Sequence, residues 1–177
     1  MKDEYIIVLD FLLRGHPNSR KSEPIAQCIG EKFLSLLEVI IKDEMDVKPE
    51  ERLYIGEKER DKVKYIKGRM KYDELTGFAK KEIEYVLDGV IERDEKRFVD
   101  FFNKAKPITT RLHSLELLQG IGKKHMWAII KGRKGKEFES FDELKKRVEM
   151  LPDPKRMVKN RIIDELKEKD RHRLFVS

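Results

Sequence analysis

The stretch Leu117–Lys136, LLQGIGKKHMWAIIKGRKGK, combines a pair of glycines with a concentration of positive charge. Gly120 and Gly122 enclose one apolar residue, and six Lys or Arg side chains follow without an acid. The first glycine can take positive φ and end a helix, and the second leaves room for a ligand near the backbone. The N–H groups that begin the next helix are a ready phosphate site. A plain glycine cap, the alternative, needs neither the second glycine nor the basic run.

The residues around this turn predict two short helices. Leu112, Leu115 and Leu118 lie on one side of the helix before the turn. The helix after it is expected from about Lys123 to Ile130, where the GRKGK segment ends it. Trp127, one helical turn past the glycines, is expected to be buried between the helices of this module.

Two further helices are predicted downstream. The sequence SFDE at 140–143 has Ser and Glu three residues apart, which is a capping box, and predicts a helix through Val148. The sequence DPKR at 153–156 places Asp at an N-cap and Pro at the first helical position, and predicts a helix through Ile162 and Leu166.

The positive charge of the chain belongs to this C-terminal part. Of 177 residues, 42% are charged and the formal net charge is +6. Residues 1–105 carry 21 Lys and Arg against 23 Asp and Glu, whereas residues 106–177 carry 19 against 11. This asymmetry indicates a polyanionic partner for the C-terminal part.

The N-terminal part has the pattern of short strands. Five runs rich in Ile, Val, Leu and Tyr are separated by polar or turn segments; they are YIIVLDFLL, IAQCI, FLSLLEVII, RLYI and VKYIKGRM. Five short strands are too few for a sandwich and fit a small barrel of the oligonucleotide-binding (OB) type. The predicted fold class is therefore α+β, with a five-stranded OB-like β-barrel over residues 1–72 followed by a helical domain.

Residues 73–106 are predicted to connect the barrel to a C-terminal domain at 107–177. Asp73 is a plausible N-cap for a helix with an apolar face that includes Ile83 and Leu87. A second helix is expected after Asp94. Its three phenylalanines, which we interpret as core rather than as a base-stacking platform, are Phe98, Phe101 and Phe102.

The segment LELLQGIGKKHMWAIIKGRKGKEFESFDEL resembles a helix-hairpin-helix motif, whose hairpin contacts a nucleic-acid backbone without reading sequence. The resemblance implies that the amides of Gly120, Gly122 and Lys124 hold phosphate oxygens. It also implies a possible monovalent cation at carbonyls around Leu118 and Ile121.

Such motifs often occur in tandem, and the second copy here would be EMLPDPKRMVKNRIIDEL. Pro152-Asp153-Pro154 stands in place of Gly-x-Gly, which removes amide donors and adds a negative charge. We expect this copy to be structural, with Lys155, Arg156 and Lys159 as the only outer contacts.

The whole chain, from YIIVLDFLLRGHP to the closing LFVS, resembles an archaeal family of uncharacterised proteins. That family is predicted to bind RNA and to combine an OB-like barrel with a helix-hairpin-helix module. The resemblance covers nearly all 177 residues and favours RNA over DNA as the partner.

Two parts of the predicted barrel could also contact nucleic acid. RGHPNSRKSEP is a polar loop between the first two strands, where OB-type proteins often bind single strands, or it is only a solvated loop. KVKYIKGRMKY alternates basic and aromatic residues, as sequence-tolerant single-strand binding requires. Tyr65 is expected in the barrel core rather than on the surface.

An enzyme is a further competing class. Helix-hairpin-helix DNA glycosylases place a catalytic Asp about twenty residues past the hairpin, where Asp142 lies. An acid in the first turn of a capped helix is expected for dipole reasons alone, and little chain remains to enclose a flipped base. One cysteine, Cys28, and four scattered histidines provide no disulfide and no metal-ligand spacing. The N-terminus lacks signal-peptide features, so we expect a cytoplasmic protein.

The sequence thus predicts a non-enzymatic protein without a cofactor that binds no membrane and whose partner is RNA, another single-stranded nucleic acid or DNA. The alternative is a DNA-binding repair or replication factor. The candidate contacts are Gly120, Ile121, Gly122, Lys123, Lys124, Lys131, Arg133 and Lys134 in the hairpin module, and Arg14, Arg20, Lys21, Lys64, Lys67 and Arg69 in the barrel.

Overall fold

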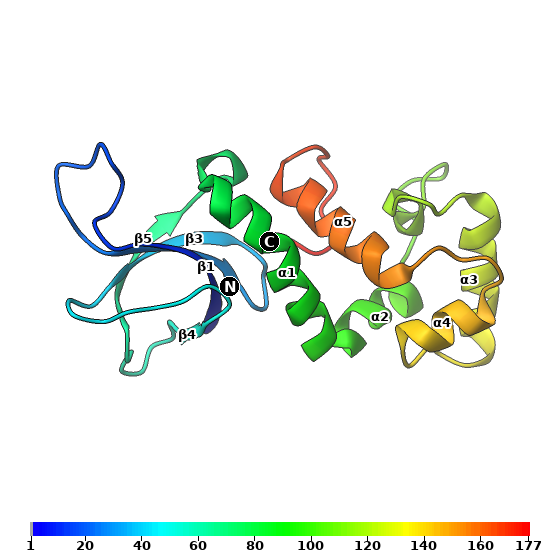
Figure 1. The fold of residues 1–177 in the computed structure, drawn as a ribbon. Helices are drawn as coiled ribbons and strands as arrows, with labels where there is room; N and C mark the ends of the chain where they lie inside the picture. Colours follow the sequence, from blue (N-terminus) through cyan, green and yellow to red (C-terminus); the bar gives the residue numbers. More distant parts are fainter. Residues whose placement is uncertain (1) are drawn as a thin grey trace. The chain divides into compact units, whose positions relative to one another are not determined.

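The computed structural model describes residues 2–177 and divides the chain into two compact units (Figure 1). The first unit is Met1–Leu87 together with Glu165–Ser177, and the second is Asp88–Asp164. Both divisions fall inside helices, within α1 (Gly77–Arg93) and within α5 (Pro154–Leu166). The C-terminal segment, which the sequence assigns to the helical domain, is therefore part of the first unit. No helix within 2–177 combines the length and apolar content needed to cross a membrane.

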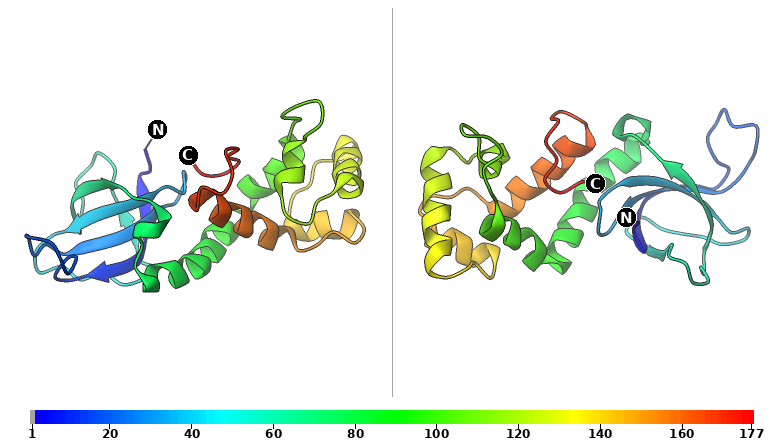
Figure 2. Two further views of the ribbon diagram at one scale, coloured as in Figure 1. Left: turned by 90° about the horizontal axis from the view of Figure 1, so that it is seen from above. Right: turned by 180° about the vertical axis from the view of Figure 1, so that it is seen from behind.

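The first unit is built on a five-stranded antiparallel half-barrel, which confirms the predicted fold class (Figures 1 and 2). Its strands are β1 (Tyr5–Leu12), β2 (Ile25–Gly30), β3 (Leu36–Ile41), β4 (Arg52–Tyr54) and β5 (Val63–Arg69). The order β4-β1-β2-β3-β5 leaves β4 and β5 at the two edges. Every residue of β2 is buried, because this strand lies at the centre of the sheet and is covered on both faces.

Helix α1 begins later than the sequence predicts. The expected N-cap, Asp73, lies instead in a single 3₁₀ turn at Tyr72–Glu74. Thr76 caps α1, since its Oγ1 accepts the N–H of Ala79 at 3.0 Å and donates to Asp10 at 2.6 Å. The side chain of Gln27 also bonds the backbone of Glu74 and Thr76. Bonds to the sheet therefore fix the start of this helix, and local propensity could not show them.

The second unit contains α2 (Glu95–Lys104), a 3₁₀ turn at Ser114–Leu117, α3 (Lys123–Gly135) and α4 (Phe141–Arg147). The predicted aromatic core is confirmed for Phe98 and Phe102, which are fully buried, while Phe101 is half-buried. Asn103 joins α2 to the segment before α4, because its amide donates to the carbonyl of Phe138 and accepts the N–H of Phe138, both at 2.8 Å. Ser140 caps α4 as predicted.

Helix α3 continues through the GRKGK segment, so the predicted end near Ile130 is wrong. The guanidinium of Arg147 donates to the carbonyls of Gly132 and Lys136, each at 2.7 Å. These bonds satisfy carbonyls at the end of the helix and place a positive charge at the negative end of its dipole. Gly132 is also needed for close packing, since an added Cβ would lie 3.0 Å from the ring of Phe138.

Candidate nucleic-acid interface

The hairpin at 118–122 has the backbone geometry that its glycines predict. Gly120 has φ of +98°, in the left-handed region that disfavours side chains. Ile121 is buried and donates its N–H to the carbonyl of Leu118 at 3.1 Å. Gly122 is the N-cap of α3, and the first helical bond runs from Met126 to its carbonyl at 3.0 Å. The amides at 123–125 therefore precede the first bond of the helix.

The two glycines are in different environments. A Cβ on Gly120 would lie 3.4 Å from Pro152 and 3.7 Å from Met157. A Cβ on Gly122 would meet nothing within 4 Å. The degenerate second copy therefore packs against the hairpin at Gly120. Gly122, at the start of α3, faces open space.

The first lysine after the hairpin is partly neutralised. Lys123 Nζ lies 2.9 Å from Glu116 Oε1, and Glu116 Oε2 also accepts the N–H of His113 at 2.8 Å. The hydrogen bond from His113 and the contact with Lys123 lower the pKa of Glu116, which keeps it ionised. We expect Lys123 to contribute less charge to a bound anion than Lys124.

One face of α3 carries three lysines and a tryptophan at helical spacing. We call Lys124, Trp127, Lys131 and Lys134 the α3 stripe; they are three, four and three residues apart. None of the three lysines has an ion-pair or hydrogen-bond partner within the described chain 2–177. Trp127 is 62% exposed, so its predicted burial is wrong. The stripe could not be predicted from the sequence, because Lys131 and Lys134 lie beyond the predicted end of the helix near Ile130.

Arg133, another predicted contact, is turned away from the stripe. Its Nη1 donates to the carbonyls of Phe102 at 3.0 Å and Ala105 at 2.9 Å, at the end of α2. Partial burial lowers the pKa of the Arg133 guanidinium. Arg133 therefore caps the C-terminus of α2. We expect its charge to stabilise the fold rather than to bind a ligand.

The two lysines of β5 are paired with acids. Lys67 Nζ lies 2.8 Å from Glu38, Lys64 lies 3.5 Å from Asp43, and Tyr65 donates its hydroxyl to Glu23 at 3.2 Å. Tyr65 is 40% exposed, so its predicted place in the core is wrong. The side chain points outward because β5 is an edge strand with a solvated face.

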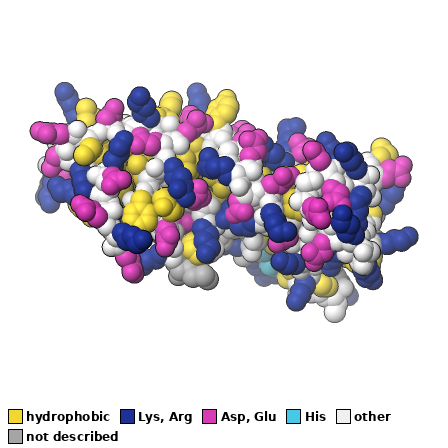
Figure 3. Space-filling model, turned by 90° about the horizontal axis from the view of Figure 1, so that it is seen from below, with side chains coloured by type: hydrophobic (Ala, Val, Ile, Leu, Met, Phe, Trp, Pro, Cys, Tyr) yellow, Lys and Arg dark blue, Asp and Glu magenta, His cyan; other side chains and the backbone are white. Residues whose placement is uncertain are grey.

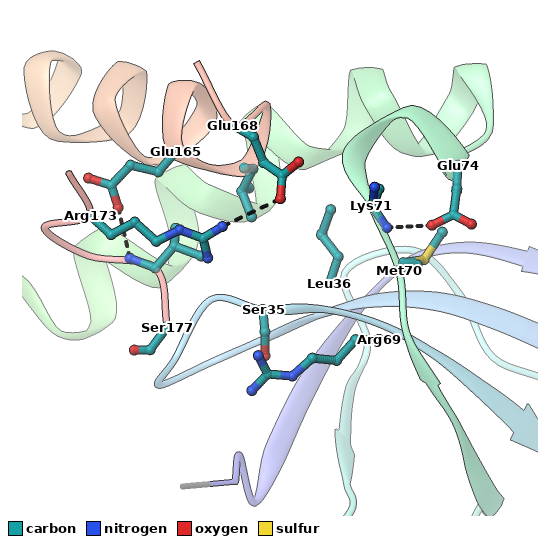
Figure 4. A pocket seen from close by; sticks show the side chains of 12 residues that line it. Ser35, Leu36, Arg69, Met70, Lys71, Glu74, Glu165, Glu168, Arg173 and Ser177 are labelled. Atoms are coloured by element: carbon teal, nitrogen blue, oxygen red, sulfur yellow. Dashed lines mark hydrogen bonds and ion pairs between the residues drawn. The ribbon is translucent and has the colours of Figure 1, made fainter. Parts of the chain in front are cut away.

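The remaining barrel candidates lie in two places in the first unit. Arg14, Arg20 and Lys21 are exposed on the loop between β1 and β2. Arg69, at the end of β5, lines a pocket of about 350 Å³ whose wall also includes Glu165, Glu168 and Arg173 (Figure 4). Arg69 extends toward Ser35 in that view.

The other predicted positions in the second unit fall into two groups. Asp142 is exposed on α4 and lines a pocket with Glu92 and Lys155, separate from the pocket beside the hairpin. Lys155 contacts Glu92, and Lys159 lies 3.1 Å from Asp88, so both lysines of the second copy are in ion pairs.

Charge is mixed over much of the surface. The face drawn in Figure 3 shows Lys and Arg side chains interleaved with Asp and Glu. A local group of unpaired lysines such as the α3 stripe therefore indicates an anion-binding surface better than the net charge does.

Comparisons with known proteins bear on the whole chain. Residues 2–177 match the model of a family described as a protein of unknown function, DUF655. An uncharacterized protein of Methanocaldococcus jannaschii is 44% identical over 176 residues, covering 98% of this chain and 80% of the relative. The crystal structure of a DUF655 protein from Archaeoglobus fulgidus has a TM-score of 0.89 and 45% identity, covering 99% of this chain and 100% of that one. The predicted resemblance to uncharacterised archaeal proteins is thus confirmed, and the chain belongs to the DUF655 family.

Proposed function

We propose that this protein binds nucleic acid without catalysis, with a preference for RNA, and that the hairpin at 118–122 and the α3 stripe form its main contact. The observation that carries the proposal is the continuity of these two features along one helix. The unbonded amides at 123–125 begin α3, Gly122 leaves them accessible, and Lys124, Lys131 and Lys134 follow without acidic partners. Amides and lysines of this kind bind phosphate without reading bases.

A single-stranded or irregular strand suits this surface better than a regular duplex. Exposed aromatic side chains bind the faces of unstacked bases, and such bases are common in RNA loops and ends. Trp127 provides an aromatic face between the lysines of the stripe. The loop residues Arg14, Arg20 and Lys21 of the first unit are proposed as secondary contacts with nucleic acid.

The DNA alternatives predict different binding preferences and a different activity from those proposed here. A repair or replication factor would bind duplex or junction DNA more tightly than single-stranded RNA. A glycosylase would release a damaged base and lose that activity in Asp142→Asn. Asp142 lines a pocket other than the one beside the hairpin, which is the observation that favours binding without catalysis.

The first test is fluorescence anisotropy with matched single-stranded and double-stranded RNA and DNA over a range of salt. If four to six phosphates of a single strand are neutralised, log K should fall against log salt with a slope of about −3 to −4. Tight binding with a slope near zero would contradict the electrostatic contact.

The second test is Gly122→Val, which places a branched side chain where the phosphate is proposed to approach. Its φ of −97° is ordinary and the space is open, so the fold should survive. We expect an affinity loss of about 10-fold or more, since hydrogen bonds to charged groups are worth about 1.5–3 kcal/mol. Gly77→Val is the matched control, because Gly77 begins α1 and a Cβ there also meets nothing within 4 Å. Unchanged affinity in a folded Gly122→Val variant would refute the hairpin contact.

A further inference from the structure

A pocket of about 330 Å³ lies beside the hairpin, between the 107–113 segment and α3. Its apolar wall includes Leu112, Met126 and Ile130, and its rim includes Trp127 and the basic residues Arg111 and Lys123. This volume is near the lower end for small-molecule sites, which suits one planar ring system rather than a large ligand. The one carboxylate in the wall, Glu116, is bonded to Lys123 and to a backbone N–H.

The same wall contains a buried polar side chain with an unused atom. His113 is 6% exposed, and its Nδ1 accepts the N–H of Leu115 at 3.1 Å. In the neutral ring the proton is therefore on Nε2, which makes that atom a donor. Burial, aided by the charge of Arg133, lowers the pKa of His113 and keeps the ring neutral near pH 7. Within residues 2–177, Nε2 has no hydrogen-bond partner.

We propose that this pocket binds one unstacked nucleobase of the strand whose phosphates lie on the hairpin. The ring of the base stacks on Trp127, and His113 Nε2 donates a hydrogen bond to a carbonyl oxygen or ring nitrogen on the edge of the base. The inference rests on the proposed function, because the hairpin supplies the strand. It adds a base-binding site to a contact that otherwise involves only phosphates.

Position and charge favour a base over an apolar side chain of a protein partner. Trp127 lies three residues past Lys124, a rise of about 4.5 Å along α3, so a strand held at the helix start brings its bases to the pocket. The rim is basic, and Lys is depleted at protein interfaces. Stacking on an exposed aromatic ring is tolerant of sequence, whereas the single donor of His113 selects bases with an acceptor at the edge.

Trp127 is the single tryptophan of the chain, so its fluorescence reports on this pocket alone. The probes are a short oligouridylate and an abasic oligonucleotide of the same length, which has the phosphates and lacks the bases. We expect both to bind with a steep salt dependence, and only the oligouridylate to quench Trp127 emission. Equal emission changes with the two probes would overturn the proposal.

The matched variants are Trp127→Ala and Tyr85→Ala, since Tyr85 on α1 is an equally exposed aromatic residue at 66% exposure. With labelled probes, Trp127→Ala should lower oligouridylate affinity about 5-fold to 100-fold and leave abasic affinity unchanged. Tyr85→Ala should change neither. His113→Phe, which removes the donor and keeps a ring, should reduce only the oligouridylate affinity.

The outcomes separate this inference from the proposed function. Salt-dependent binding of both probes with no effect of Trp127→Ala would overturn the base pocket and leave the hairpin contact standing. An equal loss for both probes would make Trp127 a structural residue and also overturn the pocket. If neither probe bound the wild-type protein, both proposals would fall.

Discussion

The edge strand β5 and the helix α3 present the same kinds of side chain in different electrostatic states. Each carries several basic residues around an exposed aromatic one, Tyr65 on the strand and Trp127 on the helix. On β5 the lysines and the tyrosine hydroxyl contact carboxylates, whereas the lysines of the α3 stripe have no partner within residues 2–177. A lysine already beside an acid releases few counterions from a nucleic acid. The comparison therefore assigns the stronger contact to α3.

The largest expected effect comes from removing the charge of the stripe. Replacing Lys124, Lys131 and Lys134 by Gln should reduce the salt slope by about 2 and lower single-strand affinity about 100-fold near 0.1 M salt. The matched variant replaces Lys62, Lys64 and Lys67, each of which lies beside a carboxylate. Anisotropy titrations over a salt series measure both. Equal losses in the two triple variants would end the distinction between the surfaces.

A smaller effect distinguishes a structural basic residue, Arg133, from a binding one, Lys131, within the second unit. Arg133→Met leaves the carbonyls of Phe102 and Ala105 without their donor and should lower the free energy of unfolding by about 1–2 kcal/mol. The salt slope should stay unchanged, because Arg133 faces α2. Denaturant unfolding and anisotropy would show this, with Lys131→Met as the control that changes binding and not stability. A reduced slope in Arg133→Met would place this residue back among the phosphate contacts.

The smallest effect would convert the sheet face into a better binder. Glu38 contacts both His16 and Lys67, so Glu38→Gln removes the negative charge that neutralises this part of the strand face. Freeing one lysine should steepen the salt slope by about 0.7 and raise affinity about 3-fold. The change is best measured in the variant that lacks the stripe lysines, where the background is low. No gain there would mean that the sheet face lies outside the path of the strand.

The strands and the hairpin were predictable because their signals are local. Alternating or continuous apolar runs mark strands wherever a sheet buries them, and the paired glycines at 120 and 122 have few other uses. The signals for the Ser140 cap and for the Asp153-Pro154 helix start are local for the same reason.

Three of the errors depend on contacts between residues distant in sequence. Arg147 bonds carbonyls at the end of α3, so the helix continues into GRKGK as far as Gly135, and this continuation aligns Lys131 and Lys134 with Lys124 and Trp127. Thr76 replaces Asp73 as a cap because Asp10 and Gln27 bond to that region. The pairing of Lys67 with Glu38 across 29 positions likewise removes a candidate contact that composition favours.

The buried carboxylate of Glu165 has a consequence for the order in which the molecule can be completed. It accepts the N–H groups of Leu174, Phe175 and Val176 at 2.7–3.0 Å, and Ser177 donates to Phe33. Residues 165–177 thus complete a unit whose other residues all precede position 88, while the second unit, 88–164, is one continuous segment. On the ribosome the inserted unit can fold as soon as it emerges, whereas the first unit is completed only after residues 165–177 have followed it. The part we propose to grip nucleic acid is therefore assembled before the part that carries the secondary contacts.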